Sequence, residues 1–155
     1  MIPIALTLIL GSALPTVAIN DLSGPGVDAE VRKVLSAQVR SAMHRTGTHT
    51  VVADEAMAAL DEALAKRLAE GCESDECLES LGASVQADRL LLGRVGRVGG
   101  KVSLTLKLVH IAKRTTEGTA SRHLDGAIED LLPLIDGTVA ELCGLEKGLP
   151  IEEVD

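Results

Sequence analysis

The chain has 155 residues, of which 46% are hydrophobic, so one domain with its own core is expected and disorder is excluded as a description of the whole. Phe, Tyr and Trp are all absent, which removes the stacking platforms that usually hold single-stranded nucleic acid. A formal net charge of −8 further disfavours a general polyanion binder, and we therefore expect no nucleic-acid partner.

The first 13 residues have the composition of a signal peptide. Ile2–Leu10 is apolar, and the small residues Gly11, Ser12 and Ala13 predict cleavage after Ala13. The segment departs from the usual pattern because no Lys or Arg precedes the apolar run. A buried N-terminal strand and an inner-membrane anchor over residues 1–19 are the alternatives. Export predicts a periplasmic or secreted protein, and membrane contact would require an uncleaved N-terminus.

A strand and a long helix are predicted next. Thr16–Leu22 has the composition of a strand, and Ser23–Gly26 ("SGPG") is a turn. Asp28 is placed to cap a helix that runs to about Thr46 and closes at Gly47. The apolar face of this helix is predicted to consist of Val31, Val34, Leu35, Val39, Ala42 and Met43.

A second strand and two more helices follow. His49–Ala53 predicts a short strand, and Asp54 is placed to cap a helix that ends at Gly71. Ser74 is placed to cap a short third helix that ends near Gly82. The stripe of the second helix is predicted to be Met57, Leu60, Leu64 and Leu68.

The second half of the chain predicts three strands joined by turns. Arg89–Val98 is a strand, and the Gly99-Gly100 pair that follows it is typical of a two-residue hairpin turn. In the next strand every second residue is apolar, which predicts one buried face. The segment "KRTTEG" is predicted to turn, and Thr119–Leu124 to form the last strand. The buried residues of the middle strand are predicted to be Val102, Leu104, Leu106 and Leu108.

A final helix is predicted over Ala127–Cys143, and Pro133 should kink it or delay its start. The complete order is β-α-β-α-α-β-β-β-α, which predicts an α/β fold with a mixed five-stranded sheet and helices packed on it. We expect a single domain over residues 15–143 and an acidic tail over 144–155.

Two stretches resemble a known family. "PTVAINDLSGPGVDAEVRKVLSAQVRSAM" is similar to the opening strand and helix of TolB amino-terminal domains, and "CLESLGASVQADRLLLGRVGRVGGKVSLTLKLVHIAKRTTEG" is similar to their second half. The curli-secretion lipoprotein CsgG and the lipoprotein activators of penicillin-binding proteins have related domains. The resemblance spans about Pro15 to Cys143 and implies an anticodon-binding-like fold and a non-enzymatic envelope protein that binds another protein. This chain departs from the family in its longer "KRTTEG" turn and in lacking a lipidated Cys.

The cysteine pair Cys72 and Cys77 suits a structural disulfide. A zinc site would need more ligands and usually closer spacing, and acidic neighbours disfavour a thiol-redox site because they raise a thiol pKa. The signal-like N-terminus indicates an oxidising compartment, so we predict that Cys72 and Cys77 are paired. Unpaired buried thiols, or a redox pair, are the alternatives. Cys143 is predicted to be a small buried hydrophobe with a free thiol, and an intermolecular disulfide is the alternative.

The other candidate motifs indicate no catalytic, cofactor or metal site. The glycines of "GRVGRVGG" (Gly93 to Gly100) fall in a hairpin, whereas a dinucleotide fingerprint opens a helix. The Ser23–Gly26 loop does lead from a strand to a helix, so a small-ligand or nucleotide site there is an alternative function. None of the four histidines lies in a recognisable nucleophile motif, and we expect no enzyme activity.

Overall fold

The computed structural model describes residues 13–24, 26–60, 66–67 and 74–145. The predicted α/β order is confirmed. In chain order the described elements are β1 (Thr16–Ile19), α1 (Ala29–Thr46), β2 (Thr50–Val51), α2 (Asp54–Ala58), α4 (Asp75–Val85), β3 (Arg89–Val98), β4 (Lys101–His110), β5 (Thr115–Asp125), the 3-10 helix η1 (Ile128–Leu131) and α5 (Leu132–Leu142).

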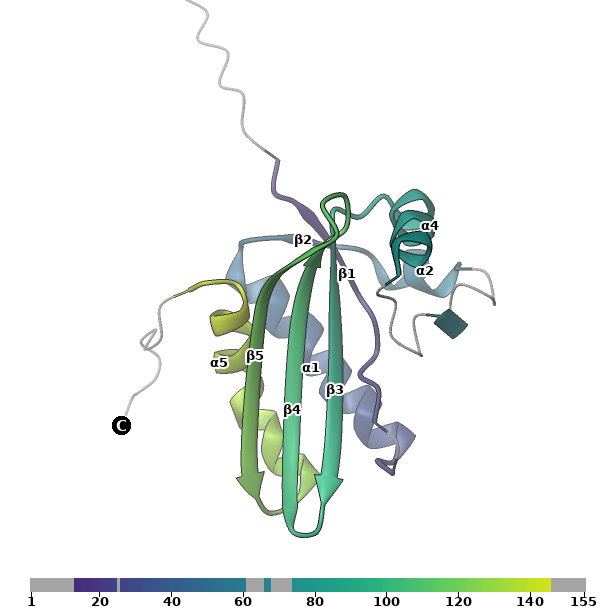
Figure 1. Cartoon of the computed structure of the whole chain (residues 1–155). Helices are drawn as coiled ribbons and strands as arrows, with labels where there is room; N and C mark the ends of the chain where they lie inside the picture. Colours follow the sequence, from purple (N-terminus) through teal and green to yellow (C-terminus); the bar gives the residue numbers. More distant parts are fainter. Residues whose placement is uncertain (1–12, 25, 61–65, 68–73, 146–155) are drawn as a thin grey trace, which may run out of the picture.

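The five strands form one mixed sheet, as predicted, and their order in the sheet is β2-β1-β3-β4-β5. β1 is parallel to both β2 and β3, whereas β3, β4 and β5 are antiparallel neighbours joined by hairpins. The three long strands stand side by side in Figure 1, with β5 at the edge of the sheet.

The larger core lies between one face of the sheet and helices α1 and α5, which cross behind the long strands in Figure 1. The predicted period-two face of β4 is confirmed, because its four alternating apolar side chains are all buried in this core. They are Val102, Leu104, Leu106 and Leu108.

A smaller core lies on the opposite face, where Leu90 and Val109 of the sheet meet Leu78 and Leu81 of α4. This core covers only the end of the sheet near α2 and α4. None of the described helices covers the rest of that face over β3, β4 and β5 (Figure 1).

Helix α1 begins and ends where the sequence predicts. The Glu30 backbone N–H donates to the Asp28 carboxylate at 2.8 Å, and Gly47 closes the helix with a left-handed φ of 68°. The prediction that Val34 lies on the buried face is wrong, because its side chain is 54% exposed at the margin of the stripe. Leu35, Val39 and Met43 are buried as predicted.

The helices on the other face differ from their predicted limits. α2 ends at Ala58, and Ala53 rather than Asp54 is its N-cap residue, with Asp54 in the first turn. The rest of the predicted stripe, Leu64 and Leu68, lies outside the described residues. Ser74 does cap α4, accepting from the Cys77 N–H at 3.2 Å, but the helix passes Gly82 and ends at Val85, where Gln86 takes a φ of 54°.

The last strand is longer than predicted. β5 begins at Thr115, because Thr115 and Thr116 already pair with the end of β4, so the turn precedes most of "KRTTEG". The final helix starts late, as expected from Pro133: a 3-10 turn comes first, and Pro133 then sits in the first turn of α5, where its missing N–H breaks no helical hydrogen bond.

β1 is shorter than predicted, and its continuation explains a glycine of β3. Regular pairing of β1 stops at Ile19. The Leu22 side chain is then buried against the sheet, and Ser23 pairs with Arg94 of β3 through an isolated bridge. A Cβ on Gly93 would lie 2.1 Å from the Leu22 Cδ2 atom. The absence of a side chain at Gly93 therefore leaves the space that the Leu22 side chain fills. Among the described residues, no helix is both long and apolar enough to cross a bilayer.

Candidate protein-binding face

The side of the antiparallel strands that no described helix covers is a polar surface. Side chains alternate across a strand, so the residues between the buried leucines of β4 point away from the main core. The strand register places their neighbours from β3 and β5 beside them. We call this surface the open face and define it as Arg94, Gly96, Val98, Lys101, Ser103, Thr105, Lys107, Thr119, Ser121, His123 and Asp125.

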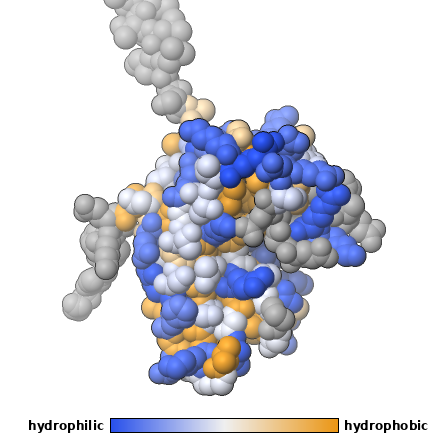
Figure 2. Space-filling view, viewed as in Figure 1, coloured by the Kyte–Doolittle hydropathy of each residue, from blue (hydrophilic) through white to orange (hydrophobic). Residues whose placement is uncertain are grey.

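Hydroxyl-bearing residues occupy the middle of the open face. Thr105 pairs in register with Arg94 on one side and Ser121 on the other, and Ser103 pairs with Gly96 and His123. The Ser121 hydroxyl lies 3.4 Å from the Thr105 hydroxyl. Figure 2 shows this side of the molecule as a mixture of pale and blue residues with orange ones between them. Short side chains leave the surface accessible to a flat partner.

Basic residues are concentrated in the segment that forms these strands and the turns between them. Residues 89–125 contain eight Lys or Arg and two Asp or Glu, a formal charge of +6 within a chain of −8. The remaining residues therefore carry −14. The strand and hairpin patterns of this segment do not indicate the segregation, whereas a count of charge along the chain reveals it.

Most of the cations outside the open face are already neutralised. Arg89 binds Glu117 at 2.6 Å and Arg122 binds Glu141 at 3.0 Å. On the open face Lys101 is 3.0 Å from Asp125, whereas Arg94 is exposed and makes no ion pair or hydrogen bond with a described residue. Arg94 is thus available to an outside group.

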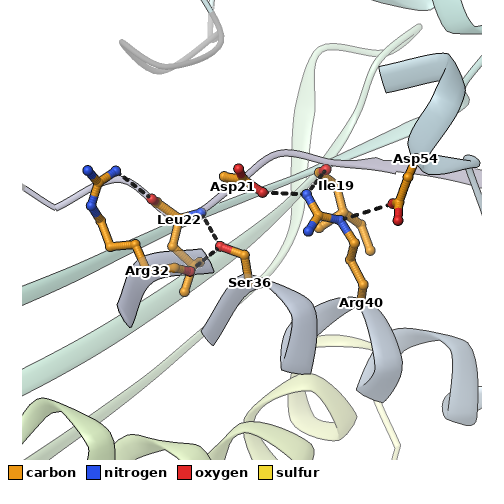
Figure 3. A network of polar contacts seen from close by, with 7 residues as sticks. All are labelled: Ile19, Asp21, Leu22, Arg32, Ser36, Arg40 and Asp54. Carbon is orange, nitrogen blue, oxygen red and sulfur yellow. Dashed lines mark hydrogen bonds and ion pairs between the residues drawn. The ribbon is translucent and has the colours of Figure 1, made fainter. Parts of the chain in front are cut away.

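A second polar cluster lies at the carboxyl end of β1 (Figure 3). Arg40 of α1 donates to the Ile19 carbonyl at 3.4 Å and to the Asp21 carboxylate at 2.5 Å, and its Nε lies 3.6 Å from the Asp54 carboxylate. Ser36 accepts from the Leu22 N–H at 2.8 Å. These contacts tie α1 to the end of β1 and to the start of α2.

A hollow of about 330 Å³ adjoins this cluster and is lined in part by Asp21, Arg40 and Asp54. Its position at the carboxyl ends of parallel strands is one where α/β proteins often bind ligands. Here, however, two carboxylates already engage the arginine, so a phosphate would have to displace Asp21 or Asp54. The cluster therefore has the arrangement of a structural clamp.

The predicted alternative site in the Ser23–Gly26 loop is packed against β3. The Ser23 N–H donates to the Gly93 carbonyl at 3.0 Å, and the Ser23 hydroxyl lies 3.3 Å from the same oxygen. Gly24 is so close to β3 that a Cβ on it would lie 2.4 Å from the Val95 carbonyl oxygen. These contacts direct Ser23 into the sheet.

The predicted disulfide involves one described residue. Cys77 is 3% exposed at the start of α4, in the smaller core, while Cys72 lies outside the described residues, so the pairing remains a prediction. Cys143 is a free thiol, 3.5 Å from the Met43 sulfur. Burial raises the pKa of the Cys143 thiol, and hydrogen bonds from Thr48 and Thr46 act in the opposite direction.

The structure does not bring the four histidines together. His44 and His123 are exposed on α1 and β5, and His110 accepts from the Lys113 N–H at 3.1 Å. Desolvation and the neighbouring Arg89 lower the pKa of His49, and Glu117 opposes this. In the part of the chain that the structure describes, no three His, Cys, Asp or Glu residues are arranged to hold a metal ion.

Comparison with solved structures shows which proteins share this fold. No family model matches the sequence, and no curated protein matches it significantly. Among solved structures, lipoprotein GNA1162 from Neisseria meningitidis is 14% identical with a TM-score of 0.58, covering 82% of this chain and 94% of that one. The LpoB C-terminal domain from Salmonella enterica is 11% identical with a TM-score of 0.55, covering 73% and 84%.

PelC from Paraburkholderia phytofirmans, a dodecamer, is 14% identical with a TM-score of 0.51, covering 83% of this chain and 85% of that one. At sequence identities this low, the similarity to these three proteins shows the fold and nothing about function. The chain therefore has the α/β fold shared by these three proteins, and the fold predicted from its resemblance to the TolB amino-terminal and CsgG-like domains is confirmed.

Proposed function

We propose that this chain is a non-catalytic domain of the cell envelope that works by binding another protein through the open face. The observation that carries the proposal is an exposed arginine on the uncovered face of the sheet. One face of β3, β4 and β5 is sealed by α1 and α5, and the other carries hydroxyls and an unengaged arginine. An antiparallel sheet often has one solvated polar face, so the uncovered face alone would not indicate a site. The exposed Arg94 in the middle of this face, which engages no described residue, is the feature that favours a binding surface.

An envelope location is supported from two directions. The signal-like N-terminus predicts export with cleavage after Ala13, and one of the proteins that share the fold is a lipoprotein. Export would place the chain in an oxidising compartment, which is the condition for a disulfide between Cys72 and Cys77. N-terminal sequencing of the protein from its host is the test, with Leu14 expected as the first residue and an intact Met1 in a soluble cytoplasmic fraction as the contrary result.

A binding role also suits the chemistry of the described residues. Their histidines are scattered, and Arg40 is held between carboxylates in a structural position. Catalysis needs a nucleophile or base that is oriented by a further group, and no such arrangement is visible among the described residues. We therefore expect that no single His or Asp substitution abolishes a turnover activity of the pure protein.

Two matched serine variants test the binding role. Ser121 lies on the open face, and Ser41 is exposed on α1, on the other side of the sheet. Tagged wild type, Ser121→Trp and Ser41→Trp are used to capture proteins from the envelope fraction, with quantitative mass spectrometry. A large side chain at the centre of an interface should lower capture of the specific partner by about tenfold or more.

The expected result is loss of one captured protein with Ser121→Trp and its retention with Ser41→Trp. Thermal melts show that both variants are folded. Equal capture by the two variants would contradict the proposal, because the partner would then bind elsewhere on the molecule.

A further inference from the structure

We infer that the partner presents an acidic segment to the open face. The inference rests on the proposed function and adds the chemistry of the partner to it. Its basis is the charge of the open face: Arg94, Lys101 and Lys107 stand there against Asp125, a formal +2 within a chain of −8. The open face lies within residues 89–125, which carry +6, and the rest of the chain carries −14. Complementary potentials align partners and speed their encounter, so an acidic surface is attracted to these strands and repelled by the remainder of the molecule.

Arg94 is the centre of this complementarity. Its strand neighbour across the hairpin is Thr105, so a guanidinium with five donors stands beside a hydroxyl in the middle of the face. It is exposed and makes no contact with a described carboxylate. Lys107 lies two residues after Thr105 on β4, on the same face, and its side chain is half-buried. An arginine fork of this kind binds carboxylates in bidentate fashion.

A protein segment fits this surface better than the other polyanions. Nucleic acids are usually gripped by aromatic stacking or dense arrays of cations, and the chain contains no aromatic residue. An anionic membrane would attract the strands but repel the −14 carried elsewhere, and the open face has one exposed apolar side chain, Val98, to insert. A row of short hydroxyl side chains instead offers hydrogen bonds to a polypeptide.

The test uses two arginines of one strand. Arg94 and Arg97 are both exposed, but the alternation of the strand places them on opposite sides of the sheet. Arg94→Glu and Arg97→Glu change the net charge equally. A fluorescent 20-residue peptide of alternating Glu and Ser is titrated against wild type and both variants at about 0.05 and 0.3 M salt, with the Gln–Ser peptide as its neutral control.

We expect the acidic peptide to bind the wild type more weakly at high salt. Arg94→Glu should weaken binding by about tenfold or more, and Arg97→Glu by less than about threefold. The capture of the envelope partner should follow the same order. Equal weakening by both variants, or equal binding of the neutral peptide, would overturn the inference.

The same set of variants separates this inference from the proposed function. If Ser121→Trp abolishes capture but Arg94→Glu does not reduce it, the open face binds a partner, and the inference that this partner presents an acidic segment is wrong. If Ser121→Trp leaves capture unchanged, the proposed function itself fails. Sedimentation with anionic phospholipid vesicles that is lost on Arg94→Glu would assign the open face to a membrane and overturn the inference.

Discussion

Replacing Gly93 with alanine tests the packing that joins the end of β1 to the sheet. The added methyl group would lie 2.1 Å from the Leu22 Cδ2 atom and 2.9 Å from the Leu106 Cδ2 atom. Leu22 and Leu106 are 1% and 0% exposed, so neither side chain can move into solvent. Overpacking of a filled core costs about 1–3 kcal/mol. The reduced flexibility of the unfolded chain returns about 0.4–1 kcal/mol. Because a 2.1 Å approach forces a buried side chain to shift, we expect a cost near the upper end of the range and therefore a net loss.

Gly96 supplies the matched control, because it lies on the same strand but on the open face. A Cβ there would lie 3.3 Å from the Ser103 hydroxyl oxygen, a contact that a small rotation relieves. Urea melts of Gly93→Ala and Gly96→Ala should therefore differ, with a lower midpoint for Gly93→Ala and little change for Gly96→Ala. Equal midpoints would show that Leu22 does not lie over Gly93.

The remaining predictions concern the core, one histidine and the cysteines. Leu106→Ala should lower the free energy of unfolding by about 2–5 kcal/mol in denaturant melts, because the side chain is fully buried, and a loss below about 1 kcal/mol would contradict the β4 register. Folding lowers the pKa of His49 from 6.5, so the stability that neutral His49 allows is present above pH 6.5 and is lost as the pH falls through the lowered pKa. His49→Asn should flatten the dependence of the unfolding free energy on pH. An unchanged pH profile would refute this prediction. Alkylation without reductant should label Cys143 alone if Cys72 and Cys77 are paired, and slowly, since the raised pKa of Cys143 reduces its thiolate; three labelled cysteines in protein taken from the envelope would refute the pairing.

Local patterns predicted the elements whose signals are short-range. The Asp28 cap, the closing Gly47 and the alternation of β4 are each decided by a few neighbouring residues, and all three are confirmed. The late start of the last helix followed from Pro133 for the same reason. The order of the elements predicted the mixed sheet, and the order of the strands within it is shown by the structure.

Features that depend on distant contacts were harder to predict. The shortened β1 and the position of Gly93 depend on Leu22, which reaches β3 across more than seventy residues of sequence. The early start of β5 depends on pairing with β4, because Glu117 and Gly118 interrupt the strand signal of Thr115 and Thr116. The Arg40 clamp joins three elements that the sequence shows only one at a time.

The open face could have been found in part from sequence. Alternation already marked Ser103, Thr105 and Lys107 as the outward residues of β4. Whether a helix covers them is a property of the whole fold, and only the structure shows that the described helices leave them uncovered. Their role as a site therefore required both the pattern and the architecture.

Site-specific photo-crosslinking tests the central claim most directly. A photoreactive amino acid is placed at Thr105 in the middle of the open face, and separately at Ser41 on α1, and the cells of the host are irradiated. We expect one specific adduct from position 105, with an acidic crosslinked segment in the partner, and none from position 41. An adduct from position 41 alone would show that the partner binds the helical side and would contradict the account.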